Sequence, residues 1–202
     1  MQKYKQLWEK TKKIILHPDE GWAEIFVEPQ EMRWHMQNYV LPAMGVLAVA
    51  ILAGYTFSAI TVGNYSFVYC LFKAIEVVAA SFFSLYVSSL LVYEISIRKI
   101  AQIDYDKLFI LMLYSLAFFW VATALAGILA NYPTLGSFFM FLGIYGMYPF
   151  YRGAKMAAIA DPLTIMKILL LAFACIVITY LAIHWSFSFI LKPLHYSHAL
   201  QQ

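Results

Sequence analysis

Ionisable side chains inside strongly apolar stretches are the residues of this sequence best placed to do chemistry. Lys73 and Glu76 lie three positions apart in such a stretch, so a helix would place them on one face. An ionisable group inside a membrane is a functional-site hypothesis by default, here for binding a substrate or a proton. The two side chains can also neutralise each other as a structural ion pair, so both interpretations stay open.

Glu94 is the third member of this candidate intramembrane polar site. It lies four positions before Arg98, near the expected inner boundary of the membrane. This spacing predicts a structural ion pair between Glu94 and Arg98.

The motifs of common enzyme and metal sites are absent from the sequence. It holds no pair of His at i and i+4, no Cys-x-x-Cys, no Gly-rich phosphate loop and no Gly-x-Ser-x-Gly elbow. The apolar stretches offer no close pair of carboxylates for acid–base work. We therefore expect no metal, no cofactor, no nucleic-acid partner and no enzymatic activity.

The composition gives the class of protein that must position these residues. Of the 202 residues, 63% are hydrophobic and only 12% are charged, about half the roughly 25% typical of soluble domains. With two Cys, the chain is no disulfide-built secreted domain, and its apolar content excludes a disordered chain. The composition predicts an integral membrane protein.

Charge-free stretches locate the membrane spans, because ionised groups are costly in a bilayer. Residues 108–151 would be about 66 Å long as one helix, against a hydrocarbon core of about 30 Å, and must fold back. The turn signal is Asn131–Thr134, which contains Pro133. We predict an all-α polytopic bundle of five transmembrane helices, or four if this hairpin is re-entrant. The spans are residues 39–62, 67–97, 108–130, 135–151 and 163–191.

The basic residues predict the orientation, since Lys and Arg concentrate in cytoplasmic loops. Twelve of the 14 fall on one side of this layout, and only Lys73 and Lys192 fall on the other. The N-terminus should therefore be cytoplasmic, and the short tail 193–202, after Lys192-Pro193, should lie outside. The twelve are Lys3, Lys5, Lys10, Lys12, Lys13, Arg33, Arg98, Lys99, Lys107, Arg152, Lys155 and Lys167.

Residues 1–38 form a cytoplasmic arm before the membrane domain 39–192. Apolar residues in its first half, with Trp8 among them, lie on one helical face, and Lys12 and Lys13 lie beside it. A second helix should start at Pro18 and place Trp22 and Ile25 on one apolar face. These five residues could anchor the arm on the anionic inner leaflet or dock a cytoplasmic protein, and both readings stay open.

Three short motifs resemble the Yip family, the five-span membrane domain of Rab-interacting proteins, in its bacterial form. They are the Pro-x-x-x-Trp-x-x-Ile stretch Pro18–Ile25, the pair Tyr114-Ser115, and the Tyr-rich run Ile144–Ala154. Many members carry a Pro after the Tyr-Ser pair, whereas this chain has Leu116–Phe118. The resemblance implies a five-span fold, a bacterial inner membrane and a non-enzymatic role.

Three functions compete at this point. A membrane scaffold or adaptor, acting in membrane organisation or trafficking-like processes, is favoured by the amphipathic arm. A small transporter or channel would use Lys73 and Glu76, and a lipid-acting enzyme would need a cluster assembled from distant spans. Small residues at helix-packing spacing, such as Gly143 with Gly146, indicate a compact bundle or a homo-oligomer.

Overall fold

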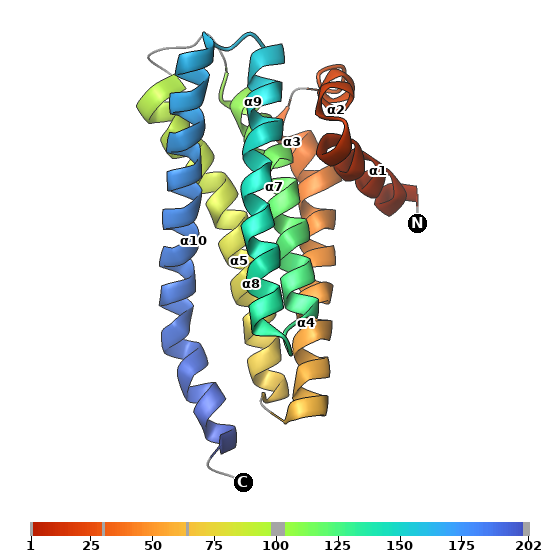
Figure 1. Cartoon of the computed structure of the whole chain (residues 1–202), viewed down its shortest axis with the longest axis vertical. Helices are drawn as coiled ribbons and strands as arrows, with labels where there is room; N and C mark the ends of the chain where they lie inside the picture. Colours follow the sequence, from red (N-terminus) through yellow and green to blue (C-terminus); the bar gives the residue numbers. More distant parts are fainter. Residues whose placement is uncertain (1, 30, 64, 98–103, 200–202) are drawn as a thin grey trace.

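The computed structural model describes residues 2–29, 31–63, 65–97 and 104–199, and these ranges fold into helices without a strand (Figure 1). Within these ranges, four helices are long and apolar enough to cross a membrane. They are Met32–Val62, Phe67–Ser96, Tyr105–Ile128 and Pro162–Lys192. The predictions of an all-α chain and of a membrane protein are confirmed at this level.

The first two long helices follow the predicted spans. The first consists of α3 (Met32–His35), the π-helical turn η1 (Met36–Val40) and α4 (Leu41–Val62). It begins before the expected residue 39, because no Gly or Pro interrupts residues 32–40. It ends at Gly63, whose φ of 73° is left-handed. The second consists of α5 (Phe67–Val92) and the π-helical turn η2 (Tyr93–Ile97).

The expected hairpin is present, but its second arm is interrupted. Helix α7 (Tyr105–Ile128) turns back before α8 (Pro133–Leu142), which is followed by the 3₁₀ turn η3 (Gly143–Gly146) and α9 (Met147–Met156). The predicted span 135–151 falls on these three pieces, and neither α8 nor α9 has the length of a candidate span. Four of the five expected spans are therefore found.

Helix α10 (Pro162–Ala199) is longer than expected. Asp161 accepts hydrogen bonds from the backbone N–H groups of Leu163 and Thr164, both at 3.1 Å, and thus caps the start of the helix. We expected Lys192-Pro193 to end it, but the helix runs on to Ala199. A Pro removes one backbone hydrogen bond and leaves later residues able to continue. The helix thus extends past the predicted end of the last span into residues 193–199.

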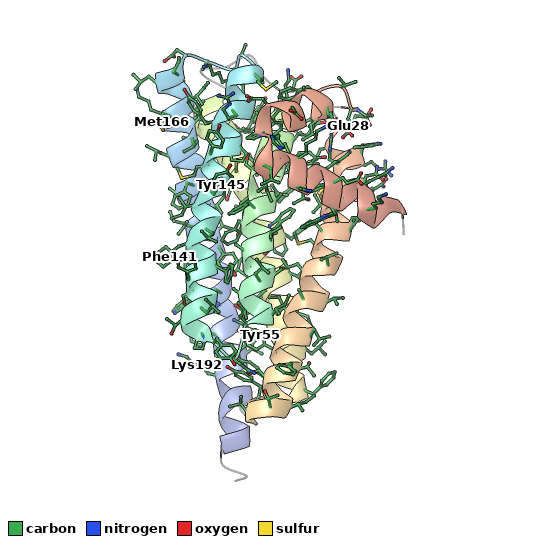
Figure 2. All side chains as sticks on the ribbon, turned by 45° about the vertical axis from the view of Figure 1, so that its right-hand side comes forward. Glu28, Tyr55, Phe141, Tyr145, Met166 and Lys192 are labelled. Atoms are coloured by element: carbon green, nitrogen blue, oxygen red, sulfur yellow. The ribbon has the colours of Figure 1, made fainter. Side chains whose placement is uncertain are left out.

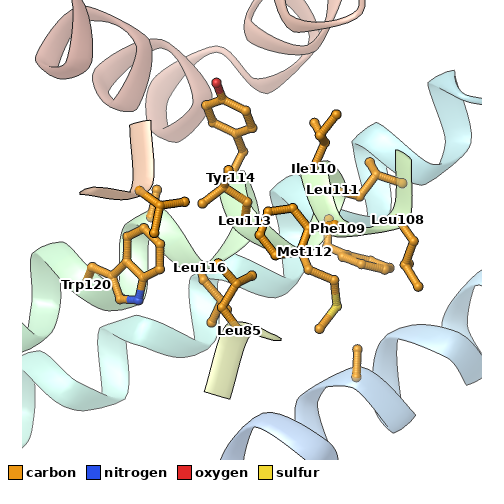
Figure 3. Packing of buried hydrophobic residues seen from close by; sticks show 14 of the residues in the cluster. Leu85, Leu108, Phe109, Ile110, Leu111, Met112, Leu113, Tyr114, Leu116 and Trp120 are labelled. Atoms are coloured by element: carbon orange, nitrogen blue, oxygen red, sulfur yellow. The ribbon is translucent and has the colours of Figure 1, made fainter. Parts of the chain in front are cut away.

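Helix α7 forms the centre of the bundle. Every residue from Leu108 to Leu113 is buried, so several faces of this helix are covered by neighbours (Figure 3). Its crossing with α4 is close, since a Cβ added to Gly54 would lie 2.0 Å from the carbonyl oxygen of Gly127. A Cβ at Gly146 of η3 would lie 2.5 Å from the Ser115 carbonyl oxygen. These glycines let the helices approach backbone to backbone.

The two N-terminal helices form a separate layer at one end of the bundle. Helix α1 (Gln2–Leu16) and helix α2 (Pro18–Ile25) pack there, while the last turns of α10 lie at the opposite end (Figure 1). Helix α2 begins where predicted, with Pro18 in its first turn followed by Asp19 and Glu20. We call α1 and α2 the N-terminal cap.

Candidate functional site

Glu76 is the centre of an ionic cluster that joins two helices. Its side chain is 1% exposed, and its Oε2 lies 2.7 Å from the Nζ of Lys73, one turn earlier on α5. Its Oε1 is bonded by the Nδ1 of His184, which α10 supplies. Both carboxylate oxygens are therefore occupied, one by a local partner and one by a partner from the last helix.

Three tyrosines that pack on one another lie near this cluster. The rings of Tyr65 and Tyr69 stack with centroids 4.8 Å apart, and Tyr55 of α4 lies 5.4 Å from Tyr65. Tyr55 lies near the end of the bundle opposite the cap (Figure 2). Within the cluster itself, His184, with a half-exposed side chain, is the most open member.

The structure does not bring Glu94 to this cluster. Glu94 lies in η2, is exposed, and is 18 residues from Glu76, about 27 Å along a helix. Its expected partner Arg98 falls outside the described residues. Of the three predicted intramembrane residues, Lys73 and Glu76 therefore form one site, and Glu94 is separate from it.

Sequence reasoning missed His184. One signal was available, because His184 is the sole Asp, Glu, Lys, Arg or His between residues 168 and 191. A lone ionisable residue in an apolar helix needs a partner of opposite charge. Glu76 is an acid in another apolar stretch, and Lys73 is its only predicted partner.

At the other end of the bundle, Trp22 fixes the cap. Its side chain is fully buried, and its indole Nε1 donates a hydrogen bond of 2.8 Å to the backbone oxygen of Pro149 in α9. Gly153 leaves room for the ring, since a Cβ there would lie 2.4 Å from the indole. The ring also stacks on Phe26 and meets Tyr114 edge-on. One tryptophan thus ties α2 to both α7 and α9.

Buried polar side chains continue this junction below the cap. His35 is fully buried, with Nδ1 3.1 Å from the Tyr114 hydroxyl and Nε2 2.9 Å from the backbone oxygen of Pro29. The hydroxyls of Thr11 in α1 and Tyr39 in η1 lie 2.7 Å apart. The Thr11–Tyr39 contact joins the cap to the first long helix, and the His35–Tyr114 contact joins that helix to α7.

Ion pairs connect the rim of the cap. Arg152 of α9 binds Asp19 through two nitrogens, with Nε 2.7 Å from Oδ1. Hydrogen bonding from Arg152 lowers the pKa of the Asp19 carboxyl below its ordinary value. Lys13 pairs with Glu24 across the two cap helices, and this contact raises the pKa of the Lys13 ammonium. The rim contacts are exposed and supplement the buried junction.

The predicted arm residues divide into two groups. Trp8 and Lys12 are exposed on α1, and Lys13 is half-buried. Trp22 and Ile25 were expected on a face that meets lipid or a partner, but both are fully buried against the bundle. That part of the prediction is corrected, because an apolar i, i+3 face packs equally well on the protein's own helices.

An apolar groove of about 550 Å³ runs between α7, the α8–α9 arm and α10. Its lining includes Phe119, Phe141, Met147, Ile176 and Tyr180, and none of the described residues that line it is Asp, Glu, Lys, Arg or His. The groove is predominantly apolar and suits hydrocarbon chains.

Within the described ranges, no group of three His, Cys, Asp or Glu side chains is arranged to hold a metal ion. Compared with known proteins, the chain matches no family model, no curated protein and no solved structure. The resemblance to the Yip family therefore stays a prediction.

Proposed function

We propose that this chain is a non-enzymatic, multi-pass membrane protein of the Yip type that acts as a scaffold or adaptor through its N-terminal cap. The observation that carries the proposal is the junction at Trp22, which fixes the cap on the bundle through Pro149 and Gly153. A surface held in place in this way loses little conformational entropy when a partner binds.

The outward face of α1 supplies the contact surface. Trp8 and Leu16 are each more than half exposed, and Lys5, Glu9 and Lys12 are exposed beside them. Exposed aromatic and apolar side chains among lysines suit either an anionic leaflet or an acidic protein surface. As an adaptor, the protein would bind a cytoplasmic protein through this face, while the cap lies next to the inner leaflet.

The proposal includes five spans in a bacterial inner membrane, with the N-terminus inside and the C-terminus outside. Residues 133–156 are helical throughout and would serve as the fifth crossing. The cap and the last turns of α10 lie at opposite ends of the bundle, as an odd number of crossings requires (Figure 1).

Photo-crosslinking in native membranes tests the adaptor role. A benzoylphenylalanine at Lys12 should give an adduct with one protein of defined mass, and Trp8→Ala should weaken that adduct. The same probe at Phe57, which is exposed on α4, is the matched control and should give no such protein adduct. Adducts with lipid alone at Lys12 would reduce α1 to an anchor and contradict the adaptor role.

A small transporter is the second candidate, and the specific observation in its favour is the burial of Glu76 with partners from two helices. Thiol labelling of Lys73→Cys tests it, in a background without the buried Cys70 and Cys175. A hydrated path predicts labelling at 73 and none at the core control Leu47→Cys. Failure to label residue 73 from either side of the membrane would exclude the path.

A further inference from the structure

Three serines of α5 are buried without a hydrogen-bond partner among the described residues. Ser81, Ser84 and Ser88 are 1%, 2% and 0% exposed, and none of their hydroxyls makes a hydrogen bond. Ser89, the next residue on the same helix, instead donates to the Leu85 carbonyl at 2.7 Å. That local bond is the usual way for a helical serine to satisfy its hydroxyl.

The three hydroxyls form one line. Their spacing of three and four residues places them on one face of α5, over about 10 Å of its length. Glu76 lies five residues before Ser81, so the ionic cluster and the three serines together extend over about 18 Å of helix. That is more than half of a hydrocarbon core of about 30 Å.

A fourth unpartnered group comes from the central helix. The Trp120 side chain is 4% exposed, and its Nε1 makes no hydrogen bond to the described residues. Helices α5 and α7 run in opposite directions, and the rings of Tyr93 and Tyr105 meet at 5.6 Å (Figure 1). Fifteen residues further on, Trp120 is therefore level with residue 78, about one turn from Ser81.

Buried donors of this kind require a partner, because leaving one unsatisfied away from water is costly. Internal water molecules that make about three hydrogen bonds are the usual partner inside proteins. We propose that α5 carries a line of internal water-binding sites, formed by the hydroxyls of Ser81, Ser84 and Ser88 and by the indole of Trp120. This inference is independent of both proposed functions, since an adaptor and a transporter can each hold such water.

Water contact at the tryptophan indoles tests the proposal directly. In protein labelled with ¹⁵N-tryptophan in micelles, the Trp120 indole proton should show a cross-peak to water, with Trp120→Phe giving the assignment. Trp22 is the matched control, because it is equally buried but bonded to the Pro149 oxygen. Its indole should show no water cross-peak, and its retained signal reports that each variant is folded.

Serine variants test whether the hydroxyls hold the water. Ser81→Ala/Ser84→Ala/Ser88→Ala should remove at least half of the Trp120 water cross-peak, while Ser89→Ala should leave it unchanged. The alternative is a dry helix contact made of small residues. A Trp120 indole without water contact, or one whose water contact survives the triple change, would overturn the proposal.

Discussion

At the scale of single residues, Glu76 shows what spacing reveals and what it hides. The pair with Lys73 follows from the i, i+3 spacing and is confirmed at 2.7 Å. His184 is 108 residues away, and only the packing of α10 on α5 brings it to the carboxylate. A local pattern cannot contain such a partner.

Glu76→Gln should be strongly destabilising. The amide removes the negative charge and leaves the Lys73 ammonium buried without compensation. We expect a loss of about 3–5 kcal/mol in the free energy of unfolding, measured by denaturant titration in mild detergent. Lys5→Gln, which removes an exposed ion pair with Glu9, is the control and should change stability by less than about 0.5 kcal/mol.

The double variant Lys73→Gln/Glu76→Gln should recover part of that loss, because no isolated charge remains. A double variant as unstable as Glu76→Gln alone would show that the charge on Lys73 is not the cause.

The Asp19–Arg152 contact predicts an acid-sensitive cap. Because the pKa of Asp19 is lowered in the folded protein, the contact contributes fully above the ordinary carboxyl value of about 3.9. Its contribution is lost as the pH falls through the lowered pKa. The melting temperatures of the wild type and Arg152→Gln should differ by a constant amount between pH 7 and 5, and this difference should shrink below pH about 4. Asp19→Asn should behave like Arg152→Gln throughout, and a melting-temperature difference at pH 3 that is as large as the difference at pH 7 would contradict the assignment.

Trp22 and Ile25 mark the limit of amphipathic analysis. Their pattern correctly predicts a helix with one apolar face. The same face could meet lipid, a partner or the chain itself, since each is apolar. The face packs on the protein's own helix α9, because Gly153 there leaves room for the Trp22 indole. Gly153 is far from Trp22 in the sequence, so this fit is seen only in the folded structure.

At the scale of helices, long charge-free stretches predicted most of the fold. The ends of α5 with η2, the turn before Pro133 and the start of α10 agree with expectation within a few residues. The break at η3 was not predicted, because Gly143 and Gly146 were interpreted only as packing residues. Each would clash with α7 if it carried a side chain, so close packing and the local 3₁₀ turn coincide there.

The crossing of α4 and α7 gives a prediction at this scale. Gly54→Ala places a methyl group against the backbone of Gly127 and Ile128, so the two helices must separate. We expect a loss of about 1–3 kcal/mol in unfolding free energy. Gly45→Ala on the same helix meets nothing within 4 Å and should cause no loss. Equal losses of unfolding free energy for the two variants would mean that the close contact of α4 with α7 does not cause the effect of Gly54→Ala.

At the scale of the whole molecule, the cap and the hairpin turn report the orientation. Tyr132→Cys, at the exposed turn between α7 and α8, should react with a membrane-impermeant maleimide on intact cells. Lys12→Cys on the cap should react only after the cells are opened. Both variants use the background without Cys70 and Cys175, which are buried. The reverse pattern would place the cap outside and contradict the orientation.

The hydrogen bond between Trp22 and Pro149 also implies an order of events during biosynthesis. The two residues are 127 positions apart, so at about 5–20 residues per second the ribosome makes the acceptor about 6–25 s after the donor. During that interval α7 and its Tyr114 are made first, and the Trp22 indole N–H stays without its acceptor until α9 is synthesised. The contact between helix α2 and helix α9 is therefore a late step of assembly, because its acceptor is made long after its donor.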